Sequence, residues 1–357
     1  MGRLVSGAGL DGAPMEIAHG KTQPPNGNAT AQTLLNDVDT PKTNLLVTDF
    51  FAGMGGLSLG FVGEGFRVCG FDVDPAAVAT YRHNVGVAEE WDARVAYPDI
   101  KPDIILGGPP CRPWSVVNVT RRGVAHRDFH LLHDFVEAIA GYRPSAFAIE
   151  NVPAVRNDLE AEVAALRTQG YSVDGRMVRY ADWGAPSRRR RYFVVGVRTG
   201  TAGGIWKTLE SIKQSQRTVQ DAIGHFRDLD RDGFADHEWG EFKTIDRYAD
   251  KYESGAYGWC RLKWDEPAPS FGNVAKTYIL HPDKDRVLSV REAMAILGFS
   301  DGFEFPPGIA RTAKYRMAAD AVSPPFSKAL ALAIGLHLQG KPDSSLVNED
   351  SWQLATW

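Results

Sequence analysis

The sequence is poor in cysteine, has no long apolar run and carries no excess of basic charge. Its three cysteines, Cys69, Cys111 and Cys260, are too few and too scattered for a disulfide framework or a zinc cluster, which indicates a reducing compartment. No apolar run reaches the roughly 18 residues that a membrane span needs, and the N-terminal residues lack the apolar core of a secretory signal. We therefore expect no membrane partner and a cytoplasmic location.

A net charge of −4 does not indicate a dedicated DNA-binding module, which is usually basic overall. Any case for nucleic acid must therefore rest on local sites. The 43% hydrophobic and 24% charged residues are typical of a globular protein that forms one large or two smaller domains. Residues 1–44 are rich in Gly, Pro, Asn, Thr and Ala, which predicts a disordered tail.

Strand-like and helical patterns alternate from residue 45 onward. We expect strands at 45–50, 67–72, 103–106, 146–150 and 192–197, and helices beginning at 57 and spanning 75–84, 154–169, 289–297 and 327–338. Such alternation predicts an α/β fold: a Rossmann-like mixed, mainly parallel sheet with helices on both faces. We place the first domain at 45–200, a smaller second domain dense in Trp, Tyr and charge at 201–285, a return segment at 286–340, and a C-terminal tail at 341–357.

A glycine-rich turn follows the first strand and opens a helix. It reads Asp49-Phe-Phe-Ala-Gly-Met-Gly-Gly56, and Asp72 ends the next strand. Glycines let backbone N–H groups approach a ligand closely, and an acidic residue at that position can bind ribose hydroxyls, so a nucleoside cofactor is indicated. The dinucleotide pattern G-x-G-x-x-G fails at Ser58, which disfavours NAD and FAD. The alternative is a tight turn that needs glycine only for packing.

Two reactive side chains follow the expected third and fourth strands. Cys111 stands in the proline-rich loop Gly107-Gly-Pro-Pro-Cys-Arg-Pro-Trp-Ser115, and Glu150 closes the next strand as Glu-Asn-Val. Both should reach the carboxyl edge of the sheet, where such folds bind ligands, and a rigid loop suits a nucleophile. The alternatives are a buried structural cysteine and a glutamate that pairs with a helix dipole.

Five segments in this order resemble the DNA cytosine-5 methyltransferase family of bacterial or phage type. They are DFFAGMGG, GGPPCRPWS, ENV, GAPSRRRRYFVVG and RVLSVREAMAILGF, within residues 45–200 and 280–338. The resemblance implies S-adenosylmethionine as cofactor, S-adenosylhomocysteine as product, and no metal. It implies cofactor contacts by Phe51, Gly53, Gly55, Gly56, Asp72, Val73, Asp92, Pro110 and Asp320. Asp72 would hold the ribose, and Asp92 would meet the adenine amino group.

The resemblance also implies the catalytic residues and the partners. Cys111 would add to C6 of a cytosine flipped out of double-stranded DNA, Glu150 would contact N3, and Arg189 and Arg191 would support the activated base. Neighbouring arginines should favour the thiolate. The enzyme is expected to be a cytoplasmic monomer in a bacterial or phage-infected cell, where a companion restriction endonuclease is possible.

Residues 201–285 occupy the position of the family's target-recognition domain, although they hold 12 Lys plus Arg against 15 Asp plus Glu. Candidate DNA contacts among the aromatic residues are Lys243, Arg247, Lys251, Arg261, Lys263 and Lys276. The alternative is that most of these aromatics only pack a small domain.

Several positions depart from the family pattern. Arg112 and Ser187 stand where glutamine is common, Leu297 replaces another glutamine, and Ala319-Asp320 replaces a Gly-Asn pair. Arg112 adds a cation beside the nucleophile, and Asp320 adds a negative charge that should tolerate a cationic donor and penalise an anionic one. Two other functions stay open at this point: an RNA cytosine-5 methyltransferase, and a catalytically silent module that binds DNA or donor.

Overall fold

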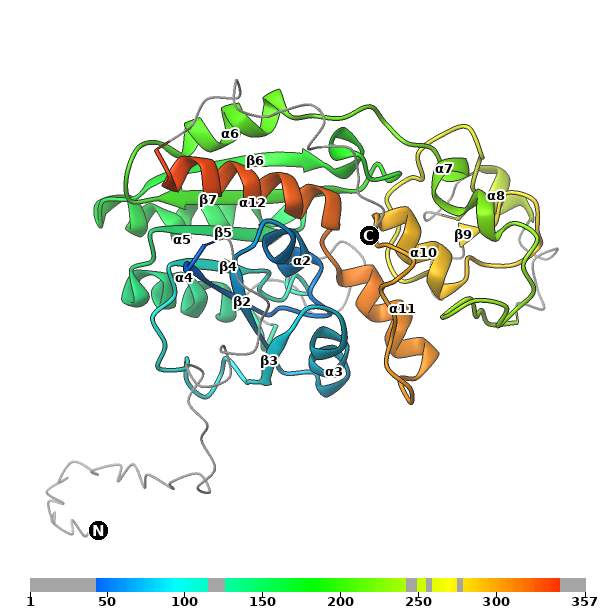
Figure 1. Cartoon of the computed structure of the whole chain (residues 1–357), viewed down its shortest axis with the longest axis horizontal. Helices are drawn as coiled ribbons and strands as arrows, with labels where there is room; N and C mark the ends of the chain where they lie inside the picture. The colour runs from blue at the N-terminus through cyan, green and yellow to red at the C-terminus, as the bar shows by residue number, and fades with distance from the viewer. Residues whose placement is uncertain (1–42, 115–125, 242–248, 255–258, 275–278, 341–357) are drawn as a thin grey trace, which may run out of the picture. The chain divides into compact units, whose positions relative to one another are not determined.

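Figure 1 shows the computed structural model of the chain, which describes residues 43–114, 126–241, 249–254, 259–274 and 279–340. Of the expected N-terminal tail only residues 43 and 44 are described, and the expected C-terminal tail 341–357 lies outside the described residues. The same holds for four residues named above, Ser115, Lys243, Arg247 and Lys276.

A seven-stranded sheet lies at the centre of the fold. Its strands are β1 (Leu46–Phe50), β2 (Arg67–Asp72), β3 (Val87–Glu90), β4 (Ile104–Gly107), β5 (Ala146–Asn151), β6 (Ser172–Arg179) and β7 (Arg190–Val197). They are arranged in the order β3-β2-β1-β4-β5-β7-β6. Strands β1 to β5 pair in parallel, whereas β7 runs antiparallel to its neighbours β5 and β6. The expected mixed, mainly parallel sheet of Rossmann-like type is confirmed.

The apolar pattern does not predict two of these strands, β3 and β6, which are the two edges of the sheet. Their sequences, VAEE and SVDGRMVR, are polar because an edge strand has one side in water and does not need a continuous apolar run. As a consequence, the strand before Cys111 is the fourth along the chain, not the third, and the strand that carries Glu150 is the fifth, not the fourth.

Helices cover both faces of the sheet. One face carries α2 (Gly56–Gly63), α3 (Pro75–Asn84), α6 (Ala202–Ser211) and α12 (Pro324–Leu338); the other carries α4 (Leu131–Tyr142) and α5 (Arg156–Thr168) (Figure 1). Helix α3 has the bounds expected from the sequence because the Asp74 side chain accepts the Ala76 N–H and Pro75 occupies the first turn. The expected helix 154–169 divides into a 3-10 turn, η3 (Pro153–Val155), and α5.

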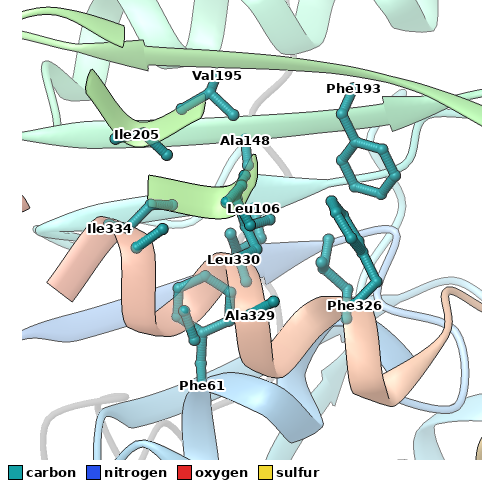
Figure 2. Packing of buried hydrophobic residues seen from close by; sticks show 14 of the residues in the cluster. Phe61, Leu106, Ala148, Phe193, Val195, Ile205, Phe326, Ala329, Leu330 and Ile334 are labelled. Carbon is teal, nitrogen blue, oxygen red and sulfur yellow. The ribbon is translucent and has the colours of Figure 1, made fainter. Parts of the chain in front are cut away.

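The first hydrophobic core lies between the sheet and α12. Figure 2 shows Phe326, Leu330 and Ile334 of α12 facing side chains of the sheet and of α2 and α6. Helix α12 also packs tightly on α2, since a Cβ at Gly60 would lie 2.2 Å from the Lys328 backbone nitrogen. None of the described helices could cross a membrane alone by length and composition, although α11 (Arg311–Asp320) and α12 pass that test together as a pair bent by 41°.

A second hydrophobic cluster gathers the short elements that follow the sheet. They are α7 (Val219–Ile223), η5 (Gly224–Phe226), α8 (Ala249–Ser254), the parallel pair β8 (Cys260–Arg261) and β9 (Ile279–Leu280), α10 (Val290–Leu297) and α11 (Arg311–Asp320). The short turn η4 (Tyr180–Trp183), between β6 and β7, belongs to the first core. Of the return segment, α10 and α11 contribute side chains to this cluster, whereas α12 belongs to the first core. Helix α6, from the region assigned to the second domain, also packs in the first core through Trp206. The domain boundaries stay a prediction.

Candidate active site

A cavity of about 420 Å³ opens at the carboxyl edge of the parallel strands. Loops after β1, β2, β3 and β4, the end of β5 and the end of α11 form its wall. Eleven of the thirteen expected site residues line it: Phe51, Gly53, Gly56, Asp72, Val73, Asp92, Pro110, Cys111, Glu150, Arg191 and Asp320. Gly55 and Arg189 are not among the lining residues. Parallel strands that end at one edge explain how positions far apart in sequence meet there.

The glycine turn combines ligand access with packing. Phe51, Gly53 and Gly55 have positive φ angles of 58°, 56° and 93°, which glycine adopts without the steric cost of a side chain. A Cβ at Gly53 would meet no atom within 4 Å, so its backbone is open to a ligand. A Cβ at Gly55 would lie 2.5 Å from Val85 Cγ2, so Gly55 is required for packing against the end of α3. Each interpretation of the turn therefore applies to a different glycine.

Asp72 connects this turn to the next strand. Its Oδ2 accepts the Gly53 N–H at 2.8 Å, and its Oδ1 accepts the Asp74 N–H at 2.9 Å. The neighbouring Val73 is 56% exposed and leaves a hydrophobic contact at the cavity wall. Asp92, after β3, accepts the Arg94 N–H at 3.0 Å through Oδ1. Carboxylate, open backbone and apolar surface together suit a nucleoside.

Cys111 is held by contacts from β5 and α5. The Asn151 side chain donates to the Pro109 carbonyl at 2.9 Å, and the Trp114 indole N–H donates to Asp158 Oδ2 at 2.7 Å. Cys111 is partly exposed and lines the cavity, whereas Cys69 is only 2% exposed within the core. This placement does not fit an inert structural cysteine.

Glu150 and Arg191 form the second half of the reactive site. Arg191 Nε lies 2.9 Å from Glu150 Oε1, although the two residues belong to antiparallel strands β5 and β7. Burial raises the pKa of Glu150, and the nearby Arg191 and Arg189 oppose this shift without cancelling it. A carboxyl group with a raised pKa is more readily protonated and can then donate a hydrogen bond into the cavity.

Arg189 has a different environment from Arg191, although both were expected to support the substrate base. It is 1% exposed, and its guanidinium donates to the Ala319 carbonyl and to the Phe271 carbonyl, the latter at 3.5 Å. Burial and the charge of Arg191 lower its pKa to about 10. Arg189 therefore links β7 to the second cluster and to the end of α11, and it can act on the cavity through its charge.

Arg191 and Arg189 lower the pKa of the Cys111 thiol, as expected of neighbouring arginines, but they do not set the direction of its net shift. The pKa of the Cys111 thiol is raised, first by burial and then by the carboxylates of Asp320 and Glu150, and these effects exceed the opposing effects of Arg191 and Arg189. Asp320 is exposed to the water of the cavity that it lines, and the protein around it raises its own pKa as well.

Further charged residues line the cavity. They are Asp49, Asp74, Arg94, Arg112, Arg127, Asp128 and Arg316. Asp49 is buried and accepts a hydrogen bond from Ser58 Oγ at 2.7 Å, yet burial raises its pKa to about 7. Its sequence signal is its place as the first residue of the glycine turn. Arg316 of α11 forms an ion pair with Asp74 at the start of α3, and no sequence pattern predicts that contact.

The described basic residues of 201–285 make local contacts. The guanidinium of Arg261 donates to the His281 carbonyl at 3.0 Å, Lys263 pairs with Glu266 at 3.2 Å, and Lys251 lies over the Trp259 ring at 5.0 Å. Their expected role in DNA contact stays a prediction.

Comparisons with known proteins match this chain to a family model and to curated relatives. The family model described as C-5 cytosine-specific DNA methylase matches residues 45–336. The chain is 30% identical over 321 residues to the type II methyltransferase M.AplI of Arthrospira platensis, covering 84% of this chain and 88% of the relative. It is 27% identical over 343 residues to the type II methylase M.HgiDII of Herpetosiphon aurantiacus, covering 82% and 96%.

Solved structures share the fold at lower identity. The S. pombe Dnmt2 methyltransferase superimposes with a TM-score of 0.64 at 14% identity, over 82% of this chain and 99% of that one. The Entamoeba histolytica methyltransferase EhMeth gives 0.61 at 17% identity, over 83% and 99%.

Proposed function

The chain belongs to the C-5 cytosine-specific DNA methylase family, and on that premise we propose that it methylates C5 of a flipped cytosine in double-stranded DNA through a covalent Cys111 adduct. It is a DNA (cytosine-5-)-methyltransferase. The observation that carries the proposed mechanism is that Cys111, Glu150 and Arg191 line the same cavity as the open backbone of Gly53.

The cofactor of the family, S-adenosylmethionine, fits the residues on one side of this cavity. The open Gly53 backbone admits close approach, Asp72 can accept from ribose hydroxyls, and the exposed Val73 offers an apolar contact for adenine. Asp92 can accept from the adenine amino group. Bound S-adenosylmethionine would supply the methyl group that C5 takes, and S-adenosylhomocysteine would be the product.

The other side of the cavity suits activation of the pyrimidine. C5 is a poor nucleophile while the ring is aromatic, so the Cys111 sulfur adds to C6 and breaks the conjugation. Glu150 donates to N3 and stabilises the charge that develops, and Arg191 holds that carboxyl group in place at 2.9 Å. Once C5 is methylated, loss of the C5 proton and elimination of the Cys111 sulfur restore the aromatic ring.

The substrate is proposed to be duplex DNA, since the curated relatives are named as type II methyltransferases. Neither C5 nor C6 is reachable within a stacked duplex, so the base must be extruded into the cavity. We assign target recognition to residues 201–285, between β7 and the return segment. Action as a cytoplasmic monomer alongside a companion restriction endonuclease is part of the same proposal. The RNA alternative has no comparable support.

Covalent trapping tests this function without knowledge of the target sequence. DNA amplified with 5-fluorodeoxycytidine triphosphate contains every target, and fluorine at C5 blocks the proton loss that would release the enzyme. With S-adenosylmethionine we expect an adduct that survives denaturing electrophoresis, is lost in Cys111→Ala and persists in Cys260→Ala, which changes a cysteine that does not line the cavity.

An adduct that persists in Cys111→Ala would contradict the proposed mechanism. Trapping on fluorinated RNA but not on DNA would support the RNA alternative. Absence of any adduct on fully substituted DNA, with S-adenosylmethionine binding intact, would support the silent module.

A further inference from the structure

Asp320 is the last residue of α11, and its position is held from outside the cavity. The buried Arg189 donates to the carbonyl of the preceding Ala319, which fixes the end of the helix where the Asp320 side chain meets the cavity. Cys111 lies in the wall of the same cavity, and so does Gly53 of the glycine turn. The carboxylate therefore belongs to the space that donor and cytosine would share.

The Asp320 carboxylate has no direct partner within the described part of the chain. Four guanidinium groups, those of Arg189, Arg112, Arg191 and Arg316, influence it as charges at longer range, and its pKa is still raised because desolvation by the surrounding protein atoms outweighs them. A carboxylate on a cavity wall with no hydrogen bond or ion pair of its own is available to a cationic ligand group.

The chemistry of the proposed reaction places such a cation nearby. Cys111 bonds to C6 of the ring, and the methyl group reaches the adjacent atom, C5. A carboxylate in the wall of the cavity that Cys111 also lines therefore shares that space with the donor's sulfonium. Among the charged groups that act on the Cys111 thiol, Asp320 has the largest effect, ahead of Glu150, Arg191 and Arg189.

We infer that Asp320 selects donor over product by charge, because it attracts the cationic sulfonium of S-adenosylmethionine but not the neutral thioether of S-adenosylhomocysteine. The inference rests on the proposed function. The same carboxylate opposes ionisation of Cys111 until a positive charge enters the cavity. Asp320 is thus a specificity-determining residue, and it couples the nucleophile to the presence of the donor.

Equilibrium binding of the two ligands tests the inference without turnover. In Asp320→Asn, which keeps the size of the side chain, we expect S-adenosylmethionine to bind about tenfold more weakly in titration calorimetry, while the affinity for S-adenosylhomocysteine changes by less than about twofold. Asp92→Asn is the matched control, because Asp92 would contact the adenine that both ligands share, so its ratio of affinities should equal that of the wild type.

Alkylation of Cys111 by iodoacetamide, without DNA or donor, gives a second readout. Removing the Asp320 charge should move the pH profile of Cys111 alkylation to lower pH, while Glu150, Arg191 and Arg189 remain as the other charges that face the thiol. Peptide mass spectrometry distinguishes Cys111 from Cys69 and Cys260. The Asp92→Asn profile should match that of the wild type.

Two results would overturn the inference: an unchanged ratio of the two affinities in Asp320→Asn, or an equal loss for both ligands, which would assign Asp320 to a part of the ligand that they share. In either case the wild type still binds both ligands and the proposed function stands. A wild type that binds neither ligand would instead contradict the proposed cofactor.

Discussion

Arg189 and Arg191, which are separated by one residue, illustrate how the role of a residue depends on what its side chain contacts. Alternation along the chain directs Arg189 and Arg191 to the inside and leaves Arg188 and Arg190 exposed. Arg191 lies beside Glu150 in the cavity, whereas Arg189 binds main-chain carbonyls behind it. Arg191 can therefore act on Glu150, the proposed hydrogen-bonding partner of the substrate base. Arg189 instead positions the end of α11 in the cavity wall.

Glu150→Gln should separate catalysis from binding. Glutamine can occupy the site but cannot transfer a proton to N3, so we expect kcat to fall about 100-fold or more, with the affinity for S-adenosylmethionine nearly unchanged. Glu160→Gln is the matched control, because Glu160 accepts from Tyr192 and Arg167 outside the cavity. Single-turnover methylation and donor titration measure the two effects. Unchanged kcat in Glu150→Gln would remove Glu150 from the reaction.

Helix α10 shows how one element depends on buried polar contacts. Ser289 and Glu292 cap its first turn reciprocally, and Glu292 also receives Arg286 through two bonds of 2.7 Å. His281 lies beside this network with a fully buried side chain, and its Nδ1 accepts N–H groups of Asp283 and Lys284, both at 3.2 Å. An Nδ1 that accepts two hydrogen bonds cannot also carry a proton.

This arrangement predicts a loss of stability in acid. Burial lowers the pKa of His281 from 6.5 to about 4, although Glu292 favours its charged form. The folded state thus binds fewer protons than the unfolded state, so the stabilisation is full above pH 6.5 and is lost as pH falls toward 4. We expect about 2 kcal/mol of the acid destabilisation, measured by urea unfolding between pH 7 and 4.5, to come from His281.

His281→Asn should remove much of that pH dependence, because asparagine keeps an acceptor for the two N–H groups and does not titrate. His133→Asn is the control, since His133 is exposed on α4 and Glu162 raises its pKa. An acid transition of the same size in wild type and His281→Asn would show that other groups cause it.

At the scale of the whole molecule, the end of the described chain stabilises its beginning. Helix α12 lies against α2 in both views (Figures 1 and 2). The contact depends on Gly60, where a Cβ would lie 2.2 Å from the backbone of Ser327 and Lys328, and on Ser327 Oγ, which accepts the Gly60 N–H at 3.2 Å. Helix α12 thus packs directly on α2, the helix whose first residues, Gly56 and Leu57, line the cavity.

Gly60→Ala should therefore destabilise the protein by about 1–3 kcal/mol, since backbone atoms cannot move aside as a flexible side chain can. Gly141→Ala is the matched change, because a Cβ at Gly141 in α4 meets nothing within 4 Å and should stabilise by about 0.5–1 kcal/mol. Thermal unfolding of both variants measures the difference. Equal shifts would mean that α12 can move away from α2 at little cost.

Local sequence patterns predicted much of this fold because buried parallel strands and capped helices depend on near neighbours. The five strands predicted from their apolar runs are β1, β2, β4, β5 and β7, and helix α3 has its predicted bounds because Asp74 and Pro75 define its start. The edge strands β3 and β6 were not predicted, because their polar sequences are also typical of loops. No local signal distinguishes such a strand until its neighbour supplies hydrogen bonds.

By itself the sequence determined the family, the mainly parallel sheet and most residues that line the cavity, because a motif at the end of each strand needs only the common sheet edge to meet the others. Tertiary structure alone decided that Gly55 packs instead of lining the cavity, that Arg189 binds carbonyls, and that Asp320 lies near enough to Cys111 to oppose its ionisation. Burial and charge act through space, and distances between residues separated by two hundred positions are set only when the chain is folded.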